Sequence, residues 1–521
     1  MGGAVENVVV VVVDALRADR LGAMGCEREL TPNIDDLTAG ATVFENAFSC
    51  VNTTDPSITS MHTGRFPRTT VYHHGRFVTL DEKRRVESVP RLPGVLQDAG
   101  FATVAAGRGI GRWHVEGFDE YPDTDIRGND RLHAVSDSLE RVHPRLQSVA
   151  ANAFMRLRTL YKRTSNEYST DVSYAEFYES AVDESEPSPV DRFLRKLDDR
   201  DDRRFYGLVH LMDTHTPYLP PPDAVEELLE SYDYPDDPVD VPDHQAARAK
   251  LTREDYEDGT GVGRIIARYD AAVREADRKV GALVDGLRAR GEWEDTALVV
   301  LSDHGESLVE HGIFCDHHGL YDETIHVPLV CRVPGAAGTR QPGATGTRVG
   351  ELVQVPDLMP TVLDLLGVEA GRDPRTTGRS LVPLLGTDGS DTAADAPEGW
   401  ESRDAVYAEE AHTQRRVAIR TRDWKYVEHE TDPRLAEASG DSLRCRYCHT
   451  VHGGERELYD LRADPAETEN LVEAREAIAD RLQGRLHGFL SDLSYPDEST
   501  ADVEYDDEDA VLQRLEDLGY R

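Results

Sequence analysis

Apolar residues gather in short, uninterrupted runs along this chain, and the first run consists of the six valines Val8–Val13. A strand with one wet face alternates apolar and polar positions, so a run without alternation predicts a strand buried on both faces. Two later runs, which begin near residues 204 and 296, share this pattern. All three runs end in side chains that can bind a metal or carry a proton: Asp14, Asp213 with His215, and Asp303 with His304.

Helical patterns separate these strands. Between the second and third runs, apolar residues recur at helical spacing as far as Leu287, and Gly291 ends the pattern before the next strand. Strands that alternate with helices predict an α/β fold, here a large α/β/α sandwich around a mixed, mostly parallel sheet. Ligands of such sheets bind at the carboxyl ends of the strands, so we expect the three strand ends to meet at one site.

We expect a large domain and a smaller one in the 521 residues. Residues 1–386 form the α/β domain, with a charged, helix-forming insertion at 125–200 that either caps the site or is a solvated excursion. A polar stretch rich in Pro, Gly, Ser and Asp at 387–404 is typical of a linker. Short strands and helical patterns in 405–521 predict an α+β subdomain built on a short antiparallel sheet, with a closing helix at its end.

The net charge of the chain limits the classes of molecule that it is expected to bind. The chain has 58 basic and 99 acidic residues and a net charge of -41, and only six of its basic residues are lysines. This balance argues against nucleic acid or an anionic membrane as a partner. A cytosol of very high salt favours an acidic surface with arginine in place of lysine, because salt screens the repulsion. A GC-rich genome with an acidic bias is the alternative explanation.

The N-terminus and the cysteines indicate a cytoplasmic protein. The first apolar run lacks a basic start and a cleavage site, and it is too short to span a bilayer. The six cysteines are too sparse for a disulfide framework. The string "CRYCH" at 445–449 matches a c-type haem attachment site, which we take as chance. A zinc or redox site at Cys445 and Cys448, or a packed turn, remains open.

The strand-end residues suit the hydrolysis of a phosphate or sulfate ester. This chemistry needs a nucleophile in line with the leaving group and cations that neutralise the ester oxygens. Asp14, Asp303 and His304 offer two carboxylates and one imidazole, a set that favours Zn²⁺ or Mn²⁺ over an all-oxygen Ca²⁺ site. A threonine hydroxyl becomes nucleophilic where such a metal lowers its pKa.

Longer motifs occur along the chain in the order known from one family. They are "VVVDALRADRLGAMG" at 11–25, "TGRFP" at 63–67, "SDHGESLVEHG" at 302–312 and "ELYDLRADPAETENL" at 457–471. In these motifs the chain resembles the sulfatase family of the alkaline phosphatase superfamily from one end to the other. The resemblance implies an alkaline phosphatase-like fold, with 1–386 as the catalytic domain, and a metal-dependent enzyme that hydrolyses ester bonds.

The resemblance places Thr54 at the position of the nucleophile. Sulfatases carry a Cys-x-Pro-x-Arg motif whose cysteine is converted to formylglycine. Here Thr54 replaces the cysteine and Ile58 the arginine, while Pro56 is kept. Threonine cannot be converted by that route, whereas superfamily relatives that act on phosphodiesters use an unmodified threonine. We therefore expect Thr54 to be the nucleophile and a metal ligand. Capping of the following helix by Thr53 or Thr54 is compatible with that role.

Two departures from the family pattern concern the metal. Many sulfatases have two adjacent aspartates after the first strand, whereas here Ala15 follows Asp14. His304 stands where Ca²⁺-type sulfatases often carry asparagine. Both changes favour Mn²⁺ or Zn²⁺ over Ca²⁺. We expect one divalent metal site and leave a second open.

The resemblance also implies roles for other side chains. His215 aligns with a histidine that donates to a non-bridging oxygen or protonates the leaving group. His317 falls where sulfatases place a lysine that contacts the leaving group, or it serves a second metal, and His318 takes its place if the register differs by one residue. Arg108 and Asp213 are candidate substrate contacts. Residues that support the site or are ordinary surface residues are His73, His74, His311 and Asp316.

Four functions follow from these observations. The leading hypothesis is a phosphodiester or phosphonate monoester hydrolase with Thr54 as nucleophile. A sulfuric ester hydrolase of the arylsulfatase type is favoured by the overall resemblance and opposed by Thr54 and Ile58. A phospho-alcohol transferase usually carries membrane helices, and a non-catalytic glycan-binding homologue has little need of a full metal set. The expected partner is a small-molecule or glycan ester.

Overall fold

The computed structural model describes most of the chain. Arg108, His73, His74, Cys448, the expected closing helix and most of the expected insertion and linker lie outside the described residues. The described residues are 5–70, 89–107, 117–119, 173–235, 241, 261–335, 346–369, 375–385, 399–410, 414–430, 445 and 450–493.

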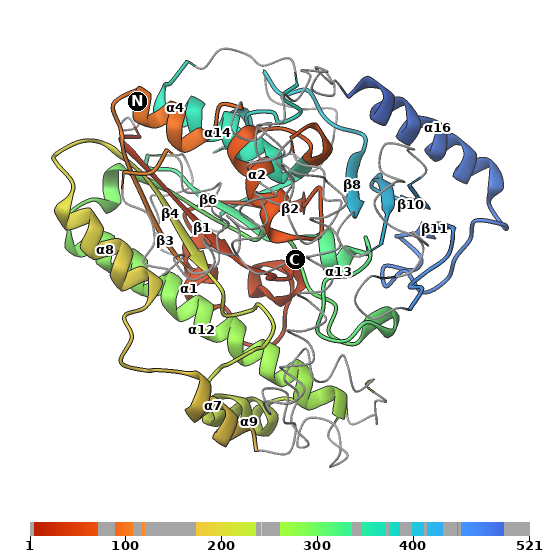
Figure 1. The fold of residues 1–521 in the computed structure, drawn as a ribbon, viewed down its shortest axis with the longest axis horizontal. Coiled ribbons are helices and arrows are strands. Elements are labelled where there is room, and N and C mark those ends of the chain that lie inside the picture. Colours follow the sequence, from red (N-terminus) through yellow and green to blue (C-terminus); the bar gives the residue numbers. More distant parts are fainter. Residues whose placement is uncertain are drawn as a thin grey trace, which may run out of the picture.

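A seven-stranded sheet forms the centre of the molecule, in the order β3-β4-β1-β5-β6-β2-β7 (Figure 1). β1 lies between β4 and β5 and is parallel to both, whereas β6 is antiparallel to its neighbours β5 and β2. All six valines of β1 are inaccessible to solvent, as their uninterrupted run predicted. The strands are β1 (Asn7–Val13), β2 (Thr42–Phe48), β3 (Ala102–Gly107), β4 (Phe205–Leu211), β5 (Thr296–Leu301), β6 (Leu329–Arg332) and β7 (Thr347–Gln354).

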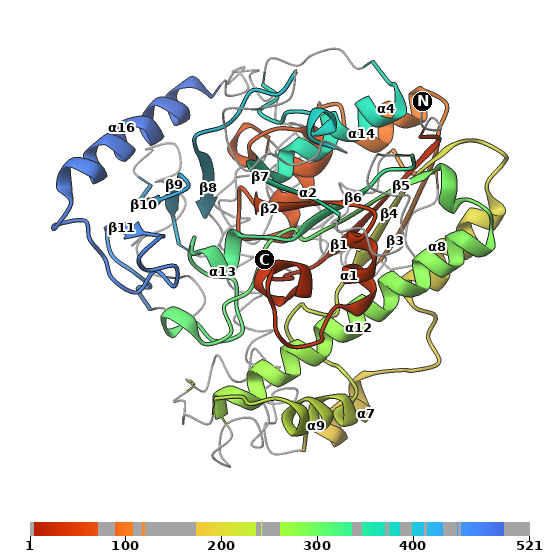
Figure 2. The same cartoon turned by 180° about the vertical axis from the view of Figure 1, so that it is seen from behind.

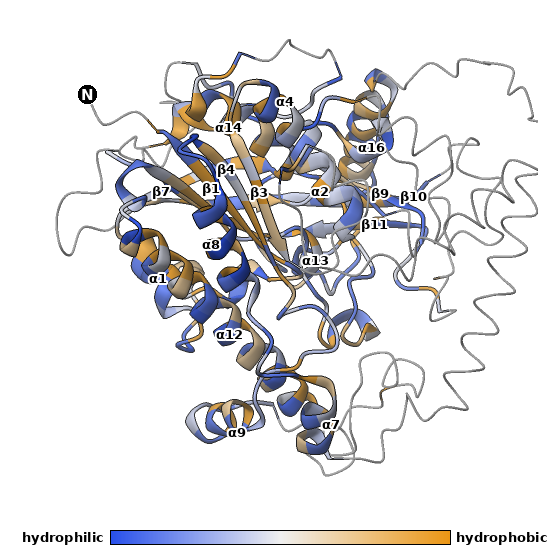
Figure 3. Cartoon of the chain, turned by 60° about the vertical axis from the view of Figure 1, so that its left-hand side comes forward, coloured by the Kyte–Doolittle hydropathy of each residue, from blue (hydrophilic) through white to orange (hydrophobic). Residues whose placement is uncertain are grey.

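Helices cover both faces of this sheet (Figures 1 and 2). Successive side chains of a strand point to opposite faces, so the valines of β1 divide between two cores. The core of Val9, Val11 and Val13 contains residues of α1 (Pro32–Thr38), α8 (Pro189–Asp199) and α12 (Gly261–Ala289). The core of Val8, Val10 and Val12 contains residues of α2 (Thr54–Thr63), α4 (Leu92–Asp98) and α14 (Leu358–Leu366). Figure 3 shows mainly apolar strands between these layers, which confirms the predicted α/β/α sandwich.

α8 lies at the end of the expected insertion 125–200. It begins with a capping box, in which Ser188 and Asp191 each accept a hydrogen bond from the other's backbone N–H, and Pro189 occupies its first position. Its buried side chains pack against the sheet beside β3 and β4. This end of the range therefore belongs to a helical layer of the sandwich and does not cap the strand ends. The neighbouring helices are α7 (Tyr174–Ala181) and α9 (Pro222–Ser231).

A separate four-stranded antiparallel sheet lies beside the sandwich, in the order β11-β10-β9-β8. α16 (Glu476–Asp492) packs on one of its faces (Figure 2). This arrangement confirms the predicted second, antiparallel sheet, whereas the exact domain boundaries stay predictions. The strands are β8 (Val406–Glu410), β9 (Arg416–Arg420), β10 (Trp424–His429) and β11 (Arg456–Asp460).

Buried ion pairs join the C-terminal part to the sandwich. Nζ of Lys425, on β10, lies 2.6 Å from Oδ1 of Asp322 and 2.8 Å from Oε1 of Glu467. Asp322 begins the short helix α13 (Asp322–Ile325), which precedes β6. At the end of the expected linker, Arg403 donates two hydrogen bonds, of 2.6 and 2.5 Å, to the buried carboxylate of Asp357.

Short 3-10 helices make up the remaining helical segments of the part of the chain that the structure describes. None of the described helices combines the length and the apolar composition that a bilayer crossing requires. The 3-10 helices are Ala18–Arg20, Gly22–Met24, Pro67–Thr69, Trp293–Asp295, Glu310–Gly312, Val355–Asp357 and Val382–Leu384.

Candidate active site

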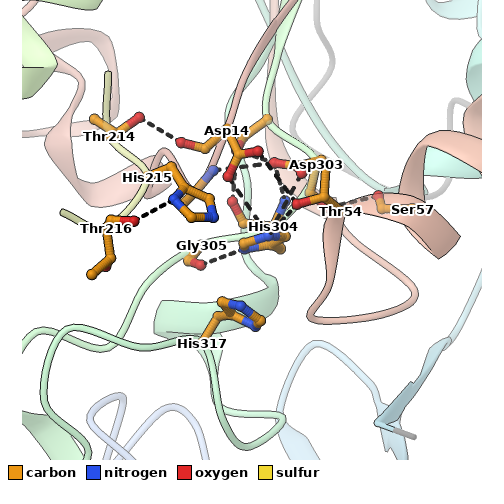
Figure 4. A network of polar contacts seen from close by, with 12 residues as sticks. Asp14, Thr54, Ser57, Thr214, His215, Thr216, Asp303, His304, Gly305 and His317 are labelled. Atoms are coloured by element: carbon orange, nitrogen blue, oxygen red, sulfur yellow. Dashed lines mark hydrogen bonds and ion pairs between the residues drawn. The ribbon is translucent and has the colours of Figure 1, made fainter. Parts of the chain in front are cut away.

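Four predicted side chains lie together at the carboxyl ends of the central strands (Figure 4): Asp14, Thr54, Asp303 and His304. Asp14 directly follows β1, the two residues 303 and 304 come just after β5, and Thr54 is the first residue of α2. β1 and β5 are parallel neighbours, so their carboxyl ends lie side by side. The predicted convergence of these strand ends is therefore present in the structure, at the place where α/β sheets usually bind ligands.

The Thr54 hydroxyl contacts an acidic and an imidazole group. Its Oγ1 lies 3.3 Å from Oδ2 of Asp14 and 3.3 Å from Nε2 of His304. Thr54 is half-buried, whereas the other two residues are inaccessible to solvent. As the first residue of a ten-residue helix, Thr54 also lies among the free N–H groups of the helix end, which favour negative charge.

Asp14, Asp303 and His304 form a buried group that fits one divalent metal ion. One potential ligand atom of each lies within 4.8 Å of the others. Nε2 of His304 is 3.9 Å from Oδ1 of Asp14 and 3.6 Å from Oδ2 of Asp303. Among the described residues, neither of these buried oxygens receives a hydrogen bond. Buried carboxylate oxygens without donors are costly, and a cation between them removes that cost.

The ring of His304 is oriented for metal binding. Its Nδ1 lies 2.8 Å from the carbonyl oxygen of Gly305, which can only accept a hydrogen bond, so Nδ1 carries the proton. Nε2 is then left with its lone pair facing the two carboxylates. A backbone carbonyl on the other ring nitrogen is the usual support of a metal-binding histidine.

The two carboxylates repel each other electrostatically. Burial raises the pKa of Asp303, and the charge of Asp14 raises it further. Burial also opposes ionisation of Asp14, but His215 and His210 outweigh it, so the pKa of Asp14 is lowered. Like charges in one buried site disfavour each other's ionised form. A divalent cation reverses this effect and allows both groups to be charged.

Hydrogen bonds between the ends of β1 and β5 hold the site in shape. Ala15, in the bend that follows β1, has φ 60°, a conformation that is uncommon for a residue with a side chain. Its N–H donates to Oδ1 of Asp303 at 3.1 Å. The hydroxyl of Ser302 accepts from the N–H of Leu16 at 2.9 Å and lies 2.6 Å from the carbonyl oxygen of Val13. The bend is therefore stabilised by groups from the neighbouring strand.

Two further predicted histidines border this group (Figure 4). Nδ1 of His215 lies 2.6 Å from the carbonyl oxygen of Thr216, and its half-buried ring lies next to Asp14. The ring of His317 lies below His304 in this view, with 4.6 Å between the ring centroids. Both rings remain partly exposed, so they can reach a substrate bound over Thr54.

Other predicted residues make different contacts. The carboxylate of Asp213 forms an ion pair with Lys279 of α12. Asp213 follows β4 in an irregular turn, where the alternation of a strand no longer determines the direction of a side chain. His318 is buried, with its Nε2 3.2 Å from Oδ2 of Asp316. These interactions do not support Asp213 or His318 as residues that bind the substrate. Arg108 lies outside the described residues.

Sequence reasoning missed His210, which lies on β4. It is inaccessible to solvent, and its Nε2 is 3.2 Å from Oδ2 of Asp14. Burial opposes protonation of this ring, but the contact with Asp14 outweighs it and raises the pKa of His210. A lone histidine within an otherwise apolar strand, beside the strand that ends in Asp14, was the available signal.

Sequence reasoning also missed Asn52. Its side-chain amide donates to the carbonyl oxygens of His317, at 2.7 Å, and Gly319, at 2.9 Å. The segment that carries Thr54 is thereby tied to the loop that carries His317. The sequence offers no signal for this contact, because it joins residues more than 260 positions apart.

Comparison with known proteins identifies the family. A family model described as "Sulfatase" matches residues 6–368, which is well over half of the chain. The chain belongs to the sulfatase family. A second model, described as "N-sulphoglucosamine sulphohydrolase, C-terminal", matches residues 309–438. The resemblance that the motifs indicated is confirmed.

Relatives of this sulfatase-family protein match nearly its full length. The choline-sulfatase of Rhizobium meliloti is 26% identical over 491 residues, which cover 90% of this chain and 82% of that protein. The Delta 4,5-hexuronate-2-O-sulfatase of Bacteroides thetaiotaomicron is 21% identical over 471 residues, which cover 89% of this chain and 84% of that protein. The structure of the phosphonate monoester hydrolase of Agrobacterium radiobacter superposes with a TM-score of 0.62 at 20% identity and covers 94% of this chain and 96% of that chain.

These relationships establish the general class of the protein. It is an ester-hydrolysing enzyme with an alkaline phosphatase-like fold, as expected. Sulfatase-family enzymes depend on a metal ion, and the buried group of Asp14, Asp303 and His304 has the composition to hold one.

Proposed function

We propose that this sulfatase-family enzyme hydrolyses phosphodiesters or phosphonate monoesters, with Thr54 as its nucleophile. One observation carries the proposal. The hydroxyl of Thr54, at the start of α2, lies 3.3 Å from Asp14 Oδ2 and from His304 Nε2. The family motif aligns this residue with the formylglycine precursor. A formylglycine mechanism needs a cysteine there, and the chain has Thr54.

The reaction balances with groups of the site. Thr54 donates its hydroxyl proton toward Oδ2 of Asp14 as its oxygen attacks phosphorus. An ester of Thr54 forms, in which phosphorus keeps its second alcohol group or its carbon substituent, and the bond between phosphorus and the leaving alcohol oxygen breaks. His317 gives a proton to that oxygen, and His215 donates to a non-bridging oxygen. Water then attacks phosphorus and returns a proton to His317, while Asp14 returns the first proton to Oγ1 of Thr54 as its bond to phosphorus breaks.

A divalent metal fits the buried group beside Thr54. Asp14, Asp303 and His304 would hold it, and when bound it supplies positive charge that lowers the pKa of the nucleophile and stabilises the ester oxygens. Two carboxylates with one imidazole favour Mn²⁺ or Zn²⁺ over Ca²⁺. The two nearest carboxylate oxygens receive no hydrogen bond from the described residues, which agrees with this role.

Sulfate ester hydrolysis is the second candidate. It is favoured by the names of curated relatives, among them the choline-sulfatase of Rhizobium meliloti. The same site geometry would serve it, because sulfate and phosphate esters share a tetrahedral centre. Thr54 in place of the formylglycine precursor weighs against it.

A substrate screen tests the proposal. Purified protein in molar KCl is assayed with an aryl phosphodiester, a phenyl phosphonate ester, an aryl phosphate and an aryl sulfate, each with Mn²⁺, Zn²⁺, Ca²⁺ or EDTA. We expect turnover of the diester or phosphonate and its loss in EDTA. Thr54→Ala should lower kcat by about 10³-fold or more, because the nucleophile is absent, and Thr54→Ser by only about 10-fold.

Thr59→Ala is the matched control. Its hydroxyl lies in the same helix but donates at 2.7 Å to the carbonyl oxygen of Asp55 and does not belong to the Thr54 group. This variant should keep nearly full activity. Rapid acid quench followed by mass spectrometry should find on Thr54 the phosphoryl group with its retained alcohol, or the phosphonyl group, of the substrate. Turnover of the aryl sulfate alone, or unchanged diester hydrolysis by Thr54→Ala, contradicts the proposal.

A further inference from the structure

A second cluster of metal-binding side chains lies behind the loop that carries His317. It consists of His318, Cys445 and His452, all of them buried. One potential ligand atom of each lies within 4.8 Å of the others. The ring centroids of the two histidines are 5.7 Å apart. We call these three residues the His-Cys-His cluster.

The distance between two of these ligand atoms matches a tetrahedral zinc site. Nδ1 of His318 lies 3.5 Å from Sγ of Cys445. Zinc bonds of about 2.05 Å to nitrogen and about 2.3 Å to sulfur, at a tetrahedral angle, separate the two ligand atoms by about 3.6 Å. The nitrogen and the sulfur are therefore already at the separation that one shared zinc ion requires.

Asp316 orients the ring of His318. Its Oδ2 lies 3.2 Å from Nε2 of His318, while the Cys445 sulfur lies 3.5 Å from Nδ1 and 3.9 Å from Nε2. A carboxylate that accepts the Nε2 proton leaves the lone pair on Nδ1, the nitrogen nearer to the sulfur. Carboxylate, histidine and metal in this order are a recurrent arrangement in zinc proteins.

Hydrogen bonds hold the segments that carry the ligands in place. The side chain of Gln414 bonds both backbone groups of His452, at 3.3 Å to its N–H and 3.0 Å to its carbonyl oxygen. The carboxylate of Glu410 accepts from the N–H of Gly319 at 3.1 Å and from that of Gln414 at 3.4 Å. The N–H of Cys445 donates to the carbonyl oxygen of Thr450 at 2.9 Å. These contacts position ligands that lie more than 120 residues apart in the chain.

We propose that the His-Cys-His cluster binds a zinc ion that is distinct from the metal beside Thr54. One thiolate and two imidazoles favour Zn²⁺ over the hard cations Mg²⁺, Ca²⁺ and Mn²⁺, which prefer oxygen ligands. The ion clips Cys445 and His452 of the C-terminal part to the loop 316–319. The neighbouring residue on that loop is His317, so the clip fixes the position of a side chain at the candidate active site.

This inference does not depend on the proposed reaction. Asp14, Asp303 and His304 contain no sulfur, so spectroscopic signals of a metal-bound thiolate do not come from that group, and the cysteine variants below assign them to Cys445. A failure of the proposed phosphodiesterase activity would leave such signals unchanged. Loss of the signals would in turn leave the role of Thr54 untouched.

Cobalt substitution of the full-length protein tests the proposal. The purified protein is freed of metal with a chelator, loaded with Co²⁺ and examined by ultraviolet and visible absorption. We expect a thiolate-to-cobalt charge-transfer band in the wild type and its loss in Cys445→Ser. Cys26→Ser, which removes a half-buried cysteine outside the cluster, is the matched control and should keep the band. Zinc analysis of protein purified without chelator should show about one zinc ion per chain fewer in Cys445→Ser than in wild type.

His452→Gln keeps the test decisive if the serine variant does not fold. This change retains the cysteine but removes one ligand, so the band should weaken and zinc should be lost at lower chelator concentrations. Absence of the band in the wild type, its persistence in Cys445→Ser, or a disulfide at Cys445 in protein kept under reducing conditions would overturn the proposal.

Discussion

Two buried histidines, His210 and His62, have opposite pKa shifts because their neighbours differ. His210 contacts the carboxylate of Asp14, which favours the charged ring and raises the pKa of His210 despite burial. His62, in α2, is equally buried, and its Nε2 lies 3.4 Å from the hydroxyl of Tyr206. Burial, assisted by the charge of Arg91, lowers the pKa of His62 to about 3. The first ring therefore belongs to the ionised site, and the second is a neutral part of the core.

The neutral state of His62 predicts a loss of stability in mild acid. The unfolded chain takes up a proton near pH 6.5, whereas the folded chain does so only near pH 3. Between these values the unfolded state binds more protons, so stability falls as pH falls. From pH 7 to pH 5 this single group costs about 2 kcal/mol of unfolding free energy.

Urea unfolding at pH 7 and pH 5 measures this effect. In His62→Gln the difference between the two pH values should be smaller by about 2 kcal/mol than in the wild type. Thr59→Ala, which changes a side chain of the same helix that does not titrate, serves as the control and should leave the difference close to the wild-type value. An identical pH dependence in His62→Gln and the wild type would show that His62 is not held neutral.

The sequence predicted those site residues that follow directly from a strand end or a family motif. Asp14, Asp303 and His304 end uninterrupted apolar runs, so pattern indicated that they meet, whereas Thr54 was assigned through the family resemblance. Asp213 also follows such a run, yet its partner is Lys279 on a distant helix. Sequence patterns describe which side chains are near a strand end but not the direction in which an irregular turn points them.

At the level of elements, the predictions succeeded where periodicity was unambiguous. The valine run of β1 could only be a strand covered on both faces, and every one of its residues is buried. In the expected insertion at 125–200, by contrast, the helical periodicity was not apparent from the sequence. Charged residues dominate that range, but α8 at its end turns Phe193 and Leu197 into the core beneath the sheet. An amphipathic helix needs few apolar positions to join a core, so composition over a long window concealed it.

The buried ion pairs of Lys425 link the two sheets, and we expect their loss to be costly. Lys425 is inaccessible to solvent and lies between the carboxylates of Asp322 and Glu467. Lys425→Met would keep most of the side-chain volume but leave the buried carboxylate of Glu467 without its cation. The partly exposed carboxylate of Asp322 keeps Arg420, whose Nη2 lies 2.9 Å from its Oδ2. Removal of one partner from a buried ion pair costs about 3–5 kcal/mol of unfolding free energy.

Denaturant unfolding of Lys425→Met checks this expectation. Arg462→Met is the matched control, because Arg462 pairs with Asp423 across 3.4 Å at an exposed position. It should change the unfolding free energy by no more than about 0.5 kcal/mol. Equal stabilities of the two variants would mean that the buried cluster does not hold the sheets together.

On the scale of the whole molecule, the acidic surface dominates. A net charge of -41 on 521 residues creates repulsion that favours expansion of the chain. Salt screens this repulsion over a Debye length of about 10 Å at 0.1 M and about 3 Å at 1 M. The composition therefore favours an environment of high ionic strength, and we propose that the protein is adapted to one.

Thermal unfolding in increasing KCl tests the proposal. The midpoint temperature should rise steadily from about 0.1 M to above about 1 M KCl as the repulsion is screened. KNO₃ at the same ionic strength is the control for effects of the anion and should raise the midpoint as well. A midpoint that is constant or falls in both salts would contradict adaptation to salt.

The position of β1 between β4 and β5 has a consequence for synthesis on the ribosome. Ala15 bonds Asp303, a residue made 288 positions later, so at about 5–20 residues per second the contact waits roughly 15–60 s. β1 thus leaves the ribosome long before its second neighbour, β5, is made. Until then the six valines form an apolar segment of high β-propensity, the kind that pairs with other nascent chains. The yield of folded protein in a cell therefore depends on how well chaperones shield this first strand.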